Sequence, residues 1–158
     1  MRHRNFGVLL IFIVLCLAVE LIASRLTLPD VIAWYPTLLK PRWNPPNQIF
    51  GPVWTALYLM MAFALWLFWQ ASTTQSKKAG YFCFGFQLFF NLIWSFLFFV
   101  CHSPFWALMD IFLLWVSIFG TLAVFYKTRP LAGYLLIPYL LWVTFAALLN
   151  FKIWTLNS

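Results

Sequence analysis

The chain has 158 residues and a formal net charge of +7, with 65% hydrophobic and only 8% charged residues. Soluble domains carry about 25% charged and about 45–50% apolar residues, so a water-soluble fold of this length is excluded. The sequence predicts an all-α integral membrane protein. Its basic charge is then explained by membrane topology, and no nucleic-acid partner is expected.

Five apolar runs are long enough to cross a bilayer as helices, each of which needs about 20 residues. The runs cover residues 6–23, 49–71, 80–101, 104–126 and 132–154. None of them alternates polar and apolar residues as a membrane β-strand would. Because the links between the runs are short, residues 1–158 are predicted to form one domain, a bundle of five transmembrane helices.

The basic residues divide between the two sides of such a bundle. Six lie on one side (Arg2, Arg4, Lys77, Lys78, Lys127 and Arg129) and four on the other (Arg25, Lys40, Arg42 and Lys152). The positive-inside rule therefore predicts a cytoplasmic N-terminus. The short C-terminal tail and the lack of an organelle signal favour a bacterial cell membrane, with the first run retained as a helix.

Acidic residues number only three in the chain, and two of them fall within apolar runs. Glu20 lies in the first run, where Arg25, one turn later, is placed to pair with it at the membrane interface. Asp110 lies about 10 Å into the fourth run at the usual helical rise. An intramembrane acid handles protons or cations in many proteins, but one near a helix N-terminus can also be stabilised by the helix dipole.

The connection between the first and second runs is rich in proline and tryptophan. Six of the nine prolines lie in it or at its edges (Pro29, Pro36, Pro41, Pro45, Pro46 and Pro52). Proline fixes φ and disfavours helix at the preceding residue, so we predict a stiff, non-helical connection. Such a connection on a helical membrane protein is suited to cover a ligand cavity.

The third run carries a polar stripe formed by Gln87, Asn91 and Ser95, with Trp94 beside it. An unpaired amide in lipid is costly, so this stripe must face the bundle interior or a cavity. Two readings stay open at this point. The stripe either joins helices by hydrogen bonds or forms the polar lining of an apolar pocket.

The fifth run repeats this spacing with Trp142, Ala146 and Asn150. An indole one turn from a small alanine leaves a ledge and a gap that suit a planar guest, and Pro138 is expected to bend the helix just before them. Trp69, Trp106 and Trp154 fit the interfacial belt. Trp115 and Trp142 lie at mid-span, where they either pack or form the wall of a cavity.

Cys16, Cys83 and Cys101 are dispersed, and His102 has no second ligand nearby in sequence, so no metal site and no obligatory cofactor are predicted. Phosphate-binding glycine loops, Ser/His/Asp arrangements and paired carboxylates are also missing from the sequence. The sequence therefore shows no apparatus for conventional hydrolysis or phosphoryl transfer.

Three segments together resemble the signature regions of the TspO/translocator protein family. They are WYPTLLKPRWNPPNQIFGPVWTALYLMM, FQLFFNLIWSFLFF and PYLLWVTFAALLNFKIWTLN, and Asp110 also resembles a family position. The resemblance implies a five-helix bundle, usually dimeric, with a pocket beneath the first connection that binds porphyrins such as protoporphyrin IX and haem. By motif position the pocket would use Tyr35, Pro45, Trp54, Asn91, Trp94, Trp142 and Ala146.

We add Gln87 as an amide donor to the ligand, and Lys40 and Arg42 as partners for porphyrin propionates. The sterol-binding pattern of eukaryotic members is degenerate, with Phe151 and Thr155 where tyrosine and a basic residue would stand. Three functions stay open: a receptor or translocator of tetrapyrroles, an enzyme that degrades porphyrin in light through Trp54 and Trp142, and a proton-coupled transporter of lipophilic cations through Glu20 or Asp110.

Overall fold

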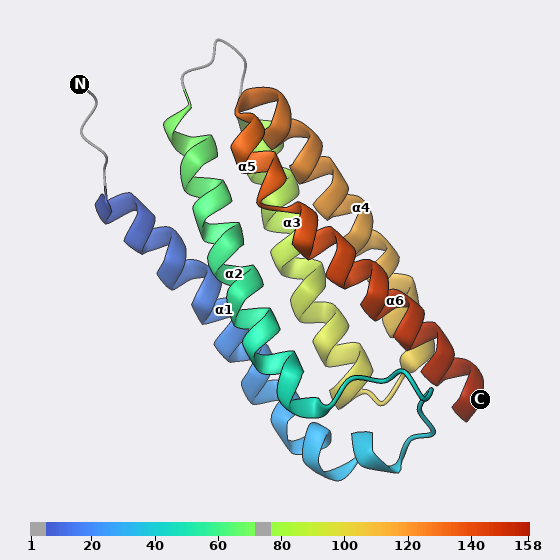
Figure 1. The fold of residues 1–158 in the computed structure, drawn as a ribbon. Helices are drawn as coiled ribbons and strands as arrows, with labels where there is room; N and C mark the ends of the chain where they lie inside the picture. Colours follow the sequence, from blue (N-terminus) through green and yellow to red (C-terminus); the bar gives the residue numbers. More distant parts are fainter. Residues whose placement is uncertain (1–5, 72–76) are drawn as a thin grey trace.

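The computed structural model describes residues 6–71 and 77–158, and all regular secondary structure within these ranges is helical. Five helical spans lie side by side, each long and apolar enough to cross a membrane (Figure 1). The helices are α1 (Phe6–Ala33), α2 (Asn47–Gln70), α3 (Lys78–Ser95), α4 (Pro104–Thr128), α5 (Pro130–Tyr134) and α6 (Ile137–Asn157), with one π-helical turn, η2 (Phe96–Val100), extending α3. The predicted five-helix membrane bundle is confirmed.

The first helix is longer than the sequence predicted. It continues ten residues past residue 23 to Ala33, and Pro29 lies inside it. Proline removes only its own N–H, and the helical bonding resumes at once, with the Trp34 N–H donating to the Asp30 carbonyl at 2.9 Å. At about 42 Å, α1 is longer than the hydrocarbon core, so its last turns reach the interface. Pro52, too, lies within a helix, near the start of α2.

The fifth span is interrupted as Pro138 suggested. The short helix α5 ends at Tyr134, and α6 starts at Ile137 with the proline in its first turn. A side-chain carbon at Gly133 would come within 2.8 Å of the Tyr126 backbone, so glycine is required for α5 to pack this closely on the end of α4.

A stack of aromatic rings lies at the end of the bundle away from the α1–α2 connection. The rings of Phe68 and Phe125 stack with centroids 4.1 Å apart, and Phe84 continues the stack. A second cluster beneath the connection includes Tyr35, Phe98 and Leu149. The space between these two clusters is not completely filled, and the pocket described below occupies it.

Basic residues flank the bundle at both ends. Lys78 begins α3 and Lys127 lies in the last turn of α4, whereas Lys40 lies in the connection between α1 and α2 and Lys152 lies near the end of α6. Arg2 and Arg4 lie outside the described residues. The cytoplasmic placement of the N-terminus stays a prediction.

Candidate functional site

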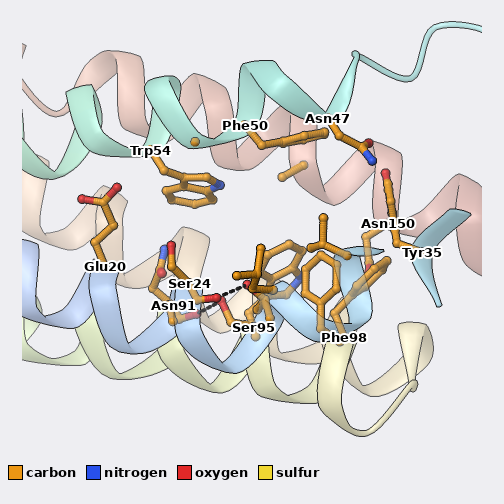
Figure 2. Close-up of a pocket in the computed structure, with 18 of the residues that line it drawn as sticks. Glu20, Ser24, Tyr35, Asn47, Phe50, Trp54, Asn91, Ser95, Phe98 and Asn150 are labelled. Carbon is orange, nitrogen blue, oxygen red and sulfur yellow. Dashed lines mark hydrogen bonds between the residues drawn. The ribbon is translucent and has the colours of Figure 1, made fainter. Parts of the chain in front are cut away.

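A pocket of about 450 Å³ lies between α1, α2, α6 and the α3–η2 segment. Its volume falls within the range of about 300–1,000 Å³ typical of small-molecule sites. Figure 2 shows it from the side, with Glu20 and Trp54 at one end and Tyr35, Asn47 and Asn150 at the other. The second end lies beside the α1–α2 connection, to which Tyr35 belongs, and we call it the mouth; the end that holds Glu20 we call the inner end.

Eight of the 23 residues that line the pocket are aromatic, and most of these eight belong to α2, the α3–η2 segment and α6. The rings of Trp54 on α2 and Trp142 on α6 are perpendicular, with centroids 6.5 Å apart, and Phe50 lies edge-on to Trp142 at 6.0 Å. Across the pocket, Trp94 stacks on Phe98 at 5.5 Å. Flat, rigid walls of this kind favour a planar apolar ligand.

A buried hydrogen-bond network supports the inner half of the pocket. The Tyr58 hydroxyl donates to Asn91 Oδ1 at 2.7 Å, and Asn91 Nδ2 donates to the Tyr139 hydroxyl at 3.0 Å. All three side chains are at least 97% buried. Asn91 therefore joins α2, α3 and α6, so that part of the polar stripe does join helices while it also lines the pocket.

Three polar atoms of residues that line the pocket are left without partners. The indole N–H groups of Trp94 and Trp142 are buried and have no hydrogen-bond acceptor among the described residues. Asn150 Oδ1 is also unpartnered there, although Asn150 Nδ2 donates to the Pro104 carbonyl at 2.9 Å. Unpaired buried donors are destabilising, so a small turn of either indole toward a ligand acceptor would be favourable.

The mouth is covered by the lid, by which we mean residues 34–46. Tyr35 is its anchor: the side chain is buried, lines the pocket and donates from its hydroxyl to Asn44 Oδ1 at 2.8 Å. Burial raises the pKa of Tyr35 to about 12, so the hydroxyl keeps the proton that it donates at neutral pH. The Lys40 ammonium donates to the carbonyls of Tyr35 (2.6 Å) and Leu38 (3.0 Å), which fixes the turn.

Two contacts fasten the lid to the rest of the bundle. Asn157, at the end of α6, accepts from the Leu39 N–H at 3.0 Å and donates to the Leu39 carbonyl at 2.9 Å. On the other side, His102 stacks on Trp34 with centroids 4.2 Å apart and bonds Asp30 at 2.9 Å. The lid is therefore held by side chains from α6 and from the η2–α4 connection.

Replacing Asn157 by alanine is expected to loosen the lid, because it removes both bonds to Leu39 at once. We expect ligand to dissociate about threefold to tenfold faster, which corresponds to about 0.7–1.4 kcal/mol for two exposed hydrogen bonds. Stopped-flow release of a fluorescent ligand measures this rate. Thr155→Ala, which removes a local bond to the Lys152 carbonyl within α6, is the matched control. Equal release rates for both variants and the parent chain would contradict this role.

Six of the predicted ligand-binding residues come together around this pocket: Tyr35, Trp54, Asn91, Trp94, Trp142 and Ala146. The lining does not include Pro45, Gln87 or Asp110. Pro45 lies in the lid and accepts from Asn44 through its carbonyl. Gln87 is fully buried deeper in α3, and its amide has no partner among the described residues. Whether the lining residues bind a ligand stays a prediction.

The two intramembrane acids are placed differently. Asp110 is buried on α4 outside the pocket, and its Oδ2 has no partner within the described ranges. Glu20 lines the pocket, but the expected ion pair with Arg25 is wrong for the described chain. Residues five apart differ by about 140° around a helix, and Glu20 instead accepts from Thr55 of α2 at 2.5 Å.

Sequence reasoning missed the wall that the end of α1 provides. Ala23, Ser24, Thr27 and Val31 line the pocket, all of them beyond or at the predicted end of this helix. These residues repeat about once per helical turn, which is typical of one face of a helix, but Pro29 favoured a non-helical connection there. Trp115, by contrast, donates to the Thr144 hydroxyl at 2.8 Å and takes no part in the lining, so of the two mid-span indoles Trp142 is the one at the cavity.

Comparisons with known proteins place the chain among relatives. The model of the TspO/MBR family matches residues 12–155. The chain is 43% identical over 157 residues to the tryptophan-rich protein TspO of Chlorobaculum tepidum, covering 98% of this chain and 99% of the relative. It is 36% identical over 126 residues to protein CrtK of Rhodobacter capsulatus (79% of each chain), and 34% identical over 138 residues to the human translocator protein (86% of this chain and 82% of the relative).

Proposed function

This chain belongs to the TspO/MBR family of integral, multi-pass membrane proteins, and we propose that it is a receptor or translocator that binds porphyrins in the pocket beneath its lid. The observation that carries the proposal is the pocket itself. Three tryptophans, Trp54, Trp94 and Trp142, line one cavity of about 450 Å³, and two of them have buried N–H groups with no partner among the described residues. A ligand that is flat, apolar and edged by acceptors would complement all of these features.

A tetrapyrrole such as protoporphyrin IX or haem has that chemistry. Its ring offers an apolar plane for the indole faces, and its propionates offer acceptors at one edge. We had expected Lys40 and Arg42 to bind the propionates. Lys40 instead donates to lid carbonyls, and neither residue lines the pocket, whereas Arg25 does. We therefore propose Arg25 as the partner of the propionates, with the acids directed toward the mouth.

The name of one relative, the human translocator protein, supports a role in moving a ligand rather than a purely structural role. Regulation of tetrapyrrole level by binding or passage across the membrane is our proposal for this chain. A homodimer, which the family resemblance implies, forms part of the same proposal. Light scattering of the detergent-solubilised chain measures the mass and would contradict the dimer if it gives that of one chain.

Titration of tryptophan fluorescence with protoporphyrin IX in neutral detergent tests the proposal. In the dark, saturable quenching is expected for the parent chain. Trp142→Phe keeps an aromatic ring but loses the N–H, so we expect it to bind about fivefold to tenfold more weakly, about 1–1.4 kcal/mol for one hydrogen bond. Trp115→Phe, which removes an indole outside the pocket, is the control. Quenching that never saturates would contradict porphyrin binding.

A second candidate function rests on the contact between Trp54 and Trp142. Their rings are 6.5 Å apart on the wall, close enough for one indole to relay an electron to the other after reaction with an excited porphyrin. Under illumination in oxygen, a degrading enzyme would bleach the porphyrin absorbance in the parent chain and not in Trp142→Phe at saturating ligand. Bleaching that continues unchanged in this variant would exclude the enzyme route through Trp142.

A further inference from the structure

The inner end of the pocket carries the side chain of Glu20, which has no ion-pair partner among the described residues. We propose that Glu20 enables this pocket to bind a second class of ligand, planar aromatic compounds that are cationic or carry strong N–H donors. This inference rests on the proposed function only in using the same pocket. It concerns the end of the cavity that a porphyrin's propionates would not occupy.

Only two of the described residues that line the pocket carry a formal charge, Glu20 and Arg25, and both lie on α1. They are five residues apart, about 7.5 Å along the helix, with Arg25 nearer the lid. Figure 2 shows the Glu20 carboxylate beside Trp54, at the end opposite Tyr35. The pocket is therefore electrically polarised, with an acid at its inner end and a cation toward its mouth.

The carboxylate of Glu20 is held in place but has acceptor capacity to spare. The Thr55 hydroxyl donates to Glu20 Oε1. The other acceptor near this hydroxyl, the Gly51 carbonyl, lies farther away, at 3.2 Å. No described donor contacts Oε2. A carboxylate has about four lone-pair sites, so one threonine bond leaves most of them unused. Glu20 is only half-buried, and its unused acceptor sites favour a ligand that brings its own donor.

Trp54 adds a second attraction for positive charge. Its ring lies next to Glu20 on the pocket wall (Figure 2), and the rings of Tyr58 and Trp142 lie at centroid distances of 6.1 and 6.5 Å from it. Aromatic faces attract cations, and the attraction grows when the cation is removed from water. A carboxylate beside aromatic walls is a combination that selects aromatic amines over neutral hydrocarbons of the same shape.

The same acid would orient a porphyrin. Propionates pushed to the inner end would meet Glu20 and be repelled, whereas at the mouth they meet Arg25. Glu20 therefore attracts cationic ligands, and it disfavours an acidic ligand that binds with its carboxylates at the inner end of the pocket.

A matched pair of probes tests the proposal: 9-aminoacridine, a planar tricyclic cation, and anthracene, a neutral ring system of the same outline. Both are titrated against tryptophan fluorescence in neutral detergent. The parent chain should bind the cation at least about tenfold more tightly, as expected for a charge-assisted bond. Glu20→Gln keeps the shape and should remove that preference while anthracene affinity changes less than about twofold.

Two further variants keep the test decisive if Glu20→Gln folds poorly. Thr55→Val frees Oε1 and should retain the preference for the cation, and Arg25→Gln removes the opposing charge and should strengthen it. A parent chain that binds both probes equally, or a Glu20→Gln variant that keeps the preference, would overturn the proposal. Protoporphyrin IX is titrated in parallel: failure of porphyrin binding with a Glu20-dependent cation preference would refute the proposed function and leave this inference standing.

Discussion

Replacing Ala146 by tryptophan is expected to weaken protoporphyrin IX binding by about 100-fold or more, because the new indole would fill the gap beside Trp142. Ala146 lines the pocket one turn from Trp142 on α6, and its small side chain keeps that part of the cavity open. The ligand would lose the space that it occupies in the pocket. A 100-fold loss of affinity corresponds to about 2.7 kcal/mol of binding free energy. Fluorescence titration in the dark measures the affinity.

Leu148→Trp is the control for this substitution. It adds the same ring to the same helix, but Leu148 is 59% exposed on the outer surface of the bundle, where lipid surrounds it. We expect its porphyrin affinity to match that of the parent chain. Ala146→Trp with parental affinity would mean that the porphyrin binds elsewhere on the protein.

Replacing Asn91 by leucine is expected to produce the largest loss of stability. The substitution is close in volume, but it leaves the hydroxyls of Tyr58 and Tyr139 without the partner that now joins them. Two buried groups left unsatisfied cost about 2–4 kcal/mol together, and each kilocalorie lowers the melting temperature by about 2–4 °C at this chain length. Thermal unfolding in detergent should therefore show a decrease of about 5–15 °C.

Ser95→Ala is the matched control on α3, since the Ser95 hydroxyl donates only to the Asn91 carbonyl of its own helix. It should lower the melting temperature by less than about 2 °C. Adding Tyr58→Phe and Tyr139→Phe to Asn91→Leu removes the stranded hydroxyls and should recover part of the loss. A decrease for Asn91→Leu no larger than that for Ser95→Ala would show that the network contributes little in lipid-like surroundings.

The sequence predicted the spans well because a membrane helix must satisfy every backbone group internally and therefore reads as an unbroken apolar run. The errors came from proline. The prediction ends the first helix at residue 23 and counts Pro29 with the stiff, non-helical connection, yet α1 continues through Pro29 to Ala33, because a proline costs a helix only one backbone bond and some bending. The ten residues that the prediction left out of this helix include five that line the pocket: Ser24, Arg25, Thr27, Leu28 and Val31.

The site could be predicted where side chains repeat on one helical face. Asn91 and Trp94 on α3, with Trp142 and Ala146 on α6, were identified in this way and do meet at one cavity. Gln87 belongs to the same polar stripe on α3, but it is buried one turn farther from the lid than Asn91, the first α3 residue that lines the pocket. Periodicity gives the face on which a residue lies and not its depth along the helix.

The role of the lid depended on contacts that no local pattern predicts. Asn157 bonds Leu39 across 118 positions of the chain, and His102 bonds Asp30 across 72. The pairing of Glu20 with Thr55 rather than with Arg25 is of the same kind. Such partners are set by how the helices are placed in space, which required the structure.

Fluorine NMR of the chain labelled with 5-fluorotryptophan tests the central claim most directly, because it reports on each of the ten tryptophans as porphyrin is added. Assignment by single Trp→Phe variants identifies each signal. Our account predicts that the signals of Trp54, Trp94 and Trp142 shift and saturate together at one protoporphyrin IX per chain, while that of Trp69, at the far end of α2, stays in place. Shifts confined to tryptophans outside the pocket, with these three signals unmoved, would contradict it.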